Sequence, residues 1–196
     1  MKSDLVVVSN NGSGIEAALA QAEKVAVYKE LSAKNALHLR LLTEEMMGMM
    51  RSITGKRTGQ FWIEDEENVY QLHLLVNAWL DMDKRDQLLA ASSTGKNEAA
   101  KGLMGRLRAF FEQGGADPAL PLYYSEMPED STGMMLNREW SMSAYQNALR
   151  PLREKEADAR EIWDELEKSV VTHVADDIKV FIRGNQVEMT IIKKMA

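Results

Sequence analysis

The sequence predicts an α+β fold, a two-layer sandwich in which helices pack on one face of a mixed, mostly antiparallel sheet. Strand patterns occur as a single strand at residues 5–8 and as two hairpins, at 60–78 and 178–192, giving about five strands in all. Helical periodicity fills the stretches between them. A parallel doubly wound sheet is excluded, because its strands would alternate singly with helices.

The broadest apolar stripe of the chain lies in the helix predicted at residues 33–53. Its members recur at helical spacing and are Leu39, Leu42, Met46, Met49 and Met50. Two acids, Glu44 and Glu45, interrupt the stripe just before Gly48. Two interpretations stay open: the acids are solvated at the edge of the stripe, or Glu44 faces a ligand pocket. The methionines around Gly48 fit either a buried core or a pliable groove for a partner.

The N-terminal segment predicts a strand followed by a helix. Residues 5–8 are a short β-branched run that ends in the turn-forming residues 9–12. Ser13 and Glu16 have the spacing of a capping box, which predicts a helix that begins after Ser13 and runs to about residue 30. Ser32 is placed to cap the next helix.

The second strand of the first hairpin alternates between two kinds of side chain. One face carries Tyr70, Leu72, Leu74, Val76 and Ala78, and the other carries Gln71, His73, Leu75 and Asn77. We expect His38 and His73 to be structural or solvated. Together with His173 they are far apart in the sequence and lack the spacing of metal ligands.

The middle of the chain predicts an insertion between the parts of the sheet. Helices are expected at 83–92 and 97–111, and a proline-containing connection at 116–137. Residues 140–174 are charged and helix-rich, with Pro151 as a break or a fresh first turn. We therefore divide the chain into a core at 1–115, a helical insertion or lid at 116–175, and a hairpin at 176–196 that completes the core sheet.

Composition excludes several classes of protein. Of the 196 residues, 45% are hydrophobic and 28% are charged, as in a soluble globular protein, and no run is long enough to span a bilayer. The absence of cysteine excludes disulfides, thiolate metal sites and a cysteine nucleophile. A net charge of -6 argues against a nucleic-acid partner. The predicted location is cytoplasmic.

Two motifs are absent from the sequence: the phosphate-binding Walker A loop and the G-x-S-x-G motif of a serine nucleophile. Thr94-Gly95-Lys96 resembles part of a Walker A loop, but Ala90 and Asn97 stand where a glycine and a hydroxyl residue are required. No G-x-S-x-G sequence marks a serine nucleophile.

Three matches carry a resemblance to a known family: the helical residues 41–45, the hairpin at 60–78 that follows them, and the segment 100–107 with its paired glycines. The closing strand at 187–191 is a further point of likeness. In their order along the chain they resemble the GHKL-type (histidine-kinase-like) ATPase fold, and within it the anti-sigma-factor serine kinase branch. The resemblance covers roughly residues 5–111 and 177–193, by order of elements more than by identity.

The resemblance implies roles for particular residues. Glu44 matches the glutamate that activates water, and Gly48 the asparagine that holds magnesium. Ala78 matches the adenine-binding aspartate, for which Asp81 or Asp83 would have to substitute. Gly102 and Gly105 match the glycines at the head of a helix whose amides meet phosphates.

The departures from the family pattern weaken the nucleotide site. Gly48 has no side chain to ligate magnesium, and Ala78 has no acceptor for the adenine amine. The Gly-x-Gly that the family places after its aspartate is missing. ATP is therefore the cofactor that the resemblance implies, with its binding weakened or lost, and no metal is expected.

Three functions follow as alternatives. The first is a regulatory protein that binds a protein partner, with residues 116–175 supplying the partner surface. The second is an active ATP-dependent serine/threonine kinase that uses Glu44 as its base and Asp81 or Asp83 for adenine. The third is a structural or oligomerising module, and a homodimer is compatible with each of these. No membrane association is expected.

Overall fold

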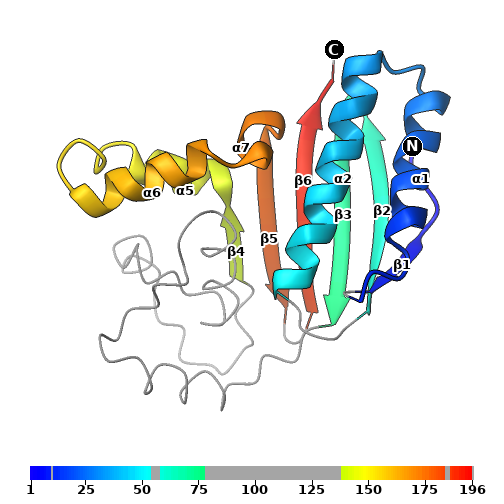
Figure 1. Cartoon of the computed structure of the whole chain (residues 1–196), viewed down its shortest axis with the longest axis horizontal. Helices are drawn as coiled ribbons and strands as arrows, with labels where there is room; N and C mark the ends of the chain where they lie inside the picture. Colours follow the sequence, from blue (N-terminus) through cyan, green and yellow to red (C-terminus); the bar gives the residue numbers. More distant parts are fainter. Residues whose placement is uncertain (10, 54–57, 78–137, 184–185, 196) are drawn as a thin grey trace.

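The computed structural model describes residues 1–9, 11–53, 58–77, 138–183 and 186–195 (Figure 1). The helices predicted at 83–92 and 97–111, and the connection predicted at 116–137, lie outside the described residues. Within the described ranges, no helix is both long and apolar enough to cross a membrane.

One antiparallel sheet of six strands organises the described residues. The strands are β1 (Val6–Ser9), β2 (Thr58–Glu66), β3 (Val69–Asn77), β4 (Arg138–Ser141), β5 (Asp177–Arg183) and β6 (Gln186–Lys194). Their order across the sheet is β1-β2-β3-β6-β5-β4. The closing hairpin therefore lies in the same sheet as the N-terminal strand, with β6 paired to β3.

The sixth strand, β4, corrects the sequence prediction of five. The segment beginning at Trp140 was expected to be helical, but Trp140 lies in β4 opposite Val180 of β5. Four residues with the sequence REWS carry no alternating pattern of their own. Their conformation is fixed by pairing with a strand that follows some 40 residues later, which local periodicity does not encode.

Two long helices, α1 (Ile15–Tyr28) and α2 (Ala33–Ile53), lie side by side on one face of the sheet (Figure 1). The apolar stripe predicted for α2 is buried, each member being at most 1% exposed: Leu39, Leu42, Met46, Met49 and Met50. Burial of each such side chain contributes about 1.5–3 kcal/mol. The predicted α+β sandwich is confirmed, with α2 as its central helix.

The start of α1 differs from the prediction. Gly14, not Ser13, is the N-cap residue, its φ is 82°, and no side chain caps the helix, so the predicted capping box of Ser13 and Glu16 is wrong. The reason is the preceding turn, in which the Ser9 N–H donates to the carbonyl oxygen of Ser13 over 2.8 Å. The predicted cap of α2 is confirmed, since the Asn35 N–H donates to Ser32 Oγ over 3.3 Å.

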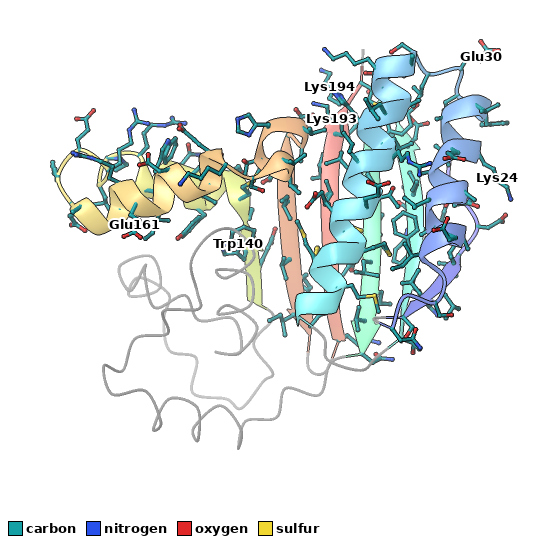
Figure 2. The ribbon with its side chains drawn as sticks, in the orientation of Figure 1. Lys24, Glu30, Trp140, Glu161, Lys193 and Lys194 are labelled. Atoms are coloured by element: carbon teal, nitrogen blue, oxygen red, sulfur yellow. The ribbon has the colours of Figure 1, made fainter. Side chains whose placement is uncertain are left out.

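Three shorter helices follow β4: α5 (Met142–Leu149), α6 (Ala157–Glu167) and α7 (Val170–Val174). Ser141 caps α5, because its Oγ accepts from the Ala144 N–H over 3.3 Å. Pro151 lies in the turn between α5 and α6 and acts as the predicted break. Trp140, labelled in Figure 2, packs against Tyr145 of α5 with ring centroids 5.9 Å apart. This contact joins the short helices to the core.

Candidate functional site on the open face of the sheet

Strand alternation gives the sheet two unlike faces. The face under the helices is fully apolar at its centre, with Phe61, Ile63, Leu72, Leu74, Val180 and Ile191 at most 1% exposed. We call the opposite side the open face; its side chains include Val7, Gln60, Trp62, Glu64, His73, Leu75, Lys179, Phe181, Glu188 and Thr190. Val7 is 65% exposed, and Leu75 and Phe181 are half-buried. This face therefore presents apolar and polar side chains together.

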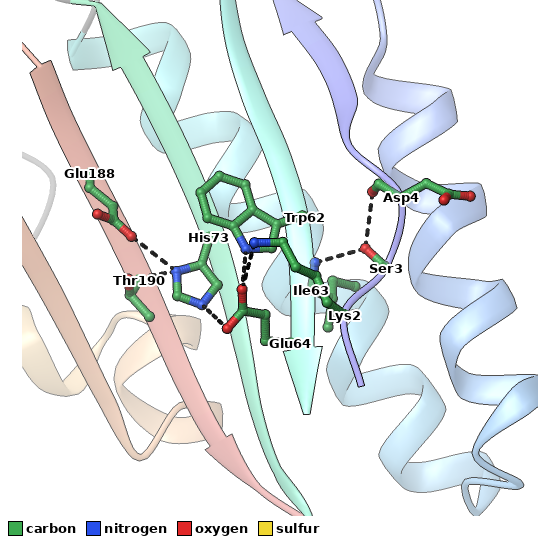
Figure 3. A network of polar contacts seen from close by, with 9 residues as sticks. All are labelled: Lys2, Ser3, Asp4, Trp62, Ile63, Glu64, His73, Glu188 and Thr190. Atoms are coloured by element: carbon green, nitrogen blue, oxygen red, sulfur yellow. Dashed lines mark hydrogen bonds and ion pairs between the residues drawn. The ribbon is translucent and has the colours of Figure 1, made fainter. Parts of the chain in front are cut away.

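An aromatic pair lies at the centre of the polar part of the open face. Trp62 of β2 stands directly opposite His73 of β3. Their rings are stacked, with centroids 4.8 Å apart and planes inclined by 5°. On the side of β2 away from β3, Lys2 forms an isolated bridge with Glu64, and its Nζ lies 4.8 Å from the Trp62 ring centroid. The Trp62 indole is thus flanked by the imidazole of His73 on one side and by the ammonium of Lys2 on the other (Figure 3).

Glu64 joins the members of this group to one another. Its Oε1 accepts from Lys2 Nζ and from Trp62 Nε1, each over 2.9 Å. Its Oε2 lies 3.8 Å from His73 Nε2. The hydrogen bonds from Lys2 and then Trp62 hold the pKa of Glu64 below its usual range. The carboxylate is therefore charged at neutral pH.

The imidazole of His73 contacts a second carboxylate through its other nitrogen. Nδ1 lies 3.2 Å from Glu188 Oε1 and 3.2 Å from Thr190 Oγ1. Since a carboxylate only accepts hydrogen bonds, we infer that Nδ1 is the donor to Glu188. Nε2 is buried and has no hydrogen-bond partner. We call the six residues the sheet-face network: Lys2, Trp62, Glu64, His73, Glu188 and Thr190.

The network does not have the arrangement of a nucleophilic site. An active hydroxyl would have to donate to an unprotonated ring nitrogen. Thr190 instead lies beside Nδ1, the nitrogen that donates to Glu188. In the part of the chain that the structure describes, no group of three or more His, Asp or Glu residues is placed to hold a metal ion.

The sequence-predicted residues that fall within the described ranges lie on α2, in the other layer. Glu44 is exposed and pairs with Arg40 one turn earlier, with Nε and Oε1 3.3 Å apart. Arg40 also pairs with Glu23 of α1. Gly48 is exposed, and nothing lies within 4 Å of the place that a Cβ would take. The exposed position of Glu44 fits the interpretation of a solvated side chain. The other predicted site residues lie outside the described residues: Ala78, Asp81, Asp83, Gly102 and Gly105.

A second charged group lies under the helices. The Asp65 side chain is only 4% exposed and pairs with Lys29 at the end of α1. The hydrogen bond to Asp65 raises the pKa of Lys29. Burial, with the Asp65 charge as a smaller cause, raises the pKa of the nearby Tyr70 hydroxyl. This group ties α1 to the far end of β2 and has a structural role.

Sequence reasoning missed the network as a group. It placed His73 on the polar face of its strand and interpreted it as structural or solvated, without naming Trp62, Glu64 or Glu188. One signal was available, because Trp62 and Glu64 are two residues apart in a strand and must share a face. The approach of Glu188, 115 residues after His73, depends on the register of β6 against β3.

Comparison of the chain with protein-family models, with curated protein sequences and with solved structures finds no match.

Proposed function

We propose that this chain is a regulatory protein that binds a protein partner through the open face of its sheet, with nucleotide binding weakened or lost. The observation that carries the proposal is the composition of that face. Three exposed or half-buried apolar side chains, Val7, Leu75 and Phe181, lie in one row across the sheet beside a stacked aromatic pair and two carboxylates. Interfaces between proteins combine apolar and aromatic side chains with polar and charged ones.

The position of Glu44 supports the second half of the proposal. A glutamate that activates water must face the reacting phosphate. Glu44 instead lies on the solvent side of α2, in an ion pair with Arg40. Gly48, one turn later, offers no ligand for magnesium. The GHKL-type resemblance thus supports an inherited fold with a changed site, and the active kinase is the alternative to be tested.

The experiment compares one substitution on the two layers of the molecule. Val7 on the open face and Val27 on α1 are both exposed, at 65% and 78%. Proteins that crosslink to the chain in extracts of its own cells are identified, purified and titrated into the wild type, Val7→Asp and Val27→Asp. We expect Val7→Asp to weaken binding at least about tenfold, because a charge replaces an apolar contact of the interface, and Val27→Asp to leave it unchanged.

Calorimetry with ATP and magnesium tests the rival function. The proposal predicts no micromolar binding to the wild type. Micromolar binding that Glu44→Ala abolishes would establish the kinase instead. Equal partner affinity in Val7→Asp and wild type, with both variants folded by circular dichroism, would contradict the role of the open face.

A further inference from the structure

We infer that the open face binds a second copy of this chain, in a two-fold symmetric dimer whose axis runs along β3 and passes Leu75. The inference rests on the proposed function and names the chain itself as the occupant of the partner surface. Any other protein that binds this face would have to displace the second copy.

The apolar side chains of the open face are spaced symmetrically about one strand. Val7 of β1, Leu75 of β3 and Phe181 of β5 lie in one row across the sheet, joined by the polar residues between them: Gln60 and Glu188. The strand order puts β1 two strands from β3 on one side and β5 two strands from it on the other (Figure 1). Since neighbouring strands are about 4.8 Å apart, Val7 and Phe181 each lie about 10 Å from Leu75.

This spacing makes the row complementary to itself. In a two-fold symmetric interface, each contact between two different residues occurs twice, once from each copy. With the axis along β3, Leu75 faces Leu75 of the second copy, and Val7 faces Phe181 of the second copy. Each apolar side chain of the row thus meets another apolar side chain, and Val7, 65% exposed in the single chain, is covered.

The polar side chains of the row fit the same axis. Gln60 and Glu188 are each one strand from Leu75, on opposite sides, so Gln60 of one copy faces Glu188 of the other. The Glu188 side chain is 41% exposed, and a carboxylate oxygen can accept from the Gln60 amide. An axis along the row would instead place Glu188 and Glu139 each opposite its own copy. Opposed like charges disfavour that arrangement.

The open face is large enough for such a dimer. Its strands hold four to nine residues each. At about 3.3 Å per residue and about 4.8 Å between strands, the face covers about 650 Å² in projection. Two copies therefore bury about 1,300 Å², within the range of about 1,200–2,000 Å² that stable interfaces occupy. The dimer is a sandwich of two sheets with the helices on the outside.

Sedimentation velocity on the full chain tests the dimer. The measurement is made at about 0.15 M salt, where a Debye length of about 8 Å screens the net charge of -6 on each copy. We expect the wild type to move from the mass of one chain to twice that mass as its concentration rises through the micromolar range. A wild type that keeps the mass of one chain throughout would overturn the inference.

Leu75→Asp tests where the two copies meet. The substitution places two carboxylates opposite each other at the axis, so it should raise the Kd of the dimer at least about tenfold. Val27→Asp, at a 78% exposed position of α1, is the matched control and should leave the Kd unchanged. Equal dissociation constants of Leu75→Asp and the wild type, with both proteins folded by circular dichroism, would overturn the inference.

A mixture of two variants tests the symmetry itself. Val7→Asp and Phe181→Lys each put a charge opposite an apolar side chain, so each alone should dimerise more weakly than the wild type. In a mixed dimer the new carboxylate faces the new ammonium, and the second Val7–Phe181 contact stays apolar. The mixture should therefore associate at least about fivefold more tightly than a mixture of Val7→Asp with Phe181→Asp, the matched control. Equal association of the two mixtures would overturn the symmetric pairing.

The outcomes separate this inference from the proposed function. If the wild type keeps the mass of one chain while Val7→Asp still weakens binding of the partner taken from extracts, the dimer fails and the partner surface stands. If the variants and mixtures associate as expected but Val7→Asp binds that partner as the wild type does, the proposed function fails and the dimer stands.

Discussion

The carbonyl oxygen of Val7 lies closer than 3.0 Å to the place that a Cβ atom at Gly14 would take. The turn before α1 folds back on β1 at this point, and Gly14 has a left-handed φ of 82°. The turn before α1 thus packs directly on the backbone of β1 at Val7 and Val8.

We predict that Gly14→Ala lowers the free energy of unfolding by about 2–3 kcal/mol, because the new methyl group meets backbone and the residue must keep a positive φ. Urea denaturation at neutral pH measures the change. A variant within about 0.5 kcal/mol of the wild type, the usual range for neutral surface substitutions, would show that the turn has no such constraint.

Gly48→Ala should have the opposite effect. The position is exposed in the middle of α2, and no heavy atom lies within 4 Å of an added Cβ. Alanine should raise the free energy of unfolding by about 0.5–1 kcal/mol, since glycine carries an entropic cost in a helix. A loss of stability in the same urea experiment would mean that Gly48 is needed for a close approach that the described residues do not make.

His38 should make the fold less stable in mild acid. Burial, with smaller contributions from Lys193 and Lys34, lowers the pKa of His38 below 6.5. The unfolded chain then binds more protons than the folded chain below pH 6.5, so the free energy of unfolding falls as pH falls through this range. His38→Gln should reduce the difference in stability between pH 7.5 and pH 5.5. The same difference in both proteins would contradict this assignment.

Lys29 should stabilise the fold by pairing with the buried carboxylate of Asp65. Lys29→Met should lower the melting temperature more than Lys24→Met, because only the former leaves a buried charge without its lysine. The Asp65 hydrogen bond raises the pKa of Lys29 above 10.5. The contribution is therefore complete below pH 10.5 and is lost as pH rises through the folded pKa. Equal melting temperatures of the two variants at pH 7 would contradict a stabilising role for Lys29.

The sequence predicted those elements whose pattern is local. The bounds predicted for α2 match the observed helix, and the alternation from Tyr70 to Val76 correctly separated the buried from the open face of β3. The two errors have different causes. One structure is decided by a contact between residues far apart in the sequence, and the other by a backbone hydrogen bond within a turn. β4 depends on pairing with β5, and the start of α1 depends on the backbone bond between Ser9 and Ser13.

The candidate site was less predictable than the fold for the same physical reason. Its residues come from four segments, and register alone brings Glu188 beside His73. A slip of one residue in β6 would turn Glu188 to the other face. The direction of the Glu44 side chain depends on how α2 is rotated about its axis. The sequence alone allowed two interpretations, a solvated side chain at the edge of the stripe or one that faces a pocket.

The partner surface is tested most directly by adding the purified partner to the ¹⁵N-labelled chain and comparing two indole signals. Trp62 lies on the open face, whereas Trp163 lies on α6, which extends beyond the β4 edge of the sheet (Figure 1). Partner binding at the open face should shift or broaden the Trp62 indole signal in proportion to the bound fraction and leave the Trp163 signal in place. A change at Trp163 with Trp62 unaltered would contradict the assignment of the open face as the partner surface.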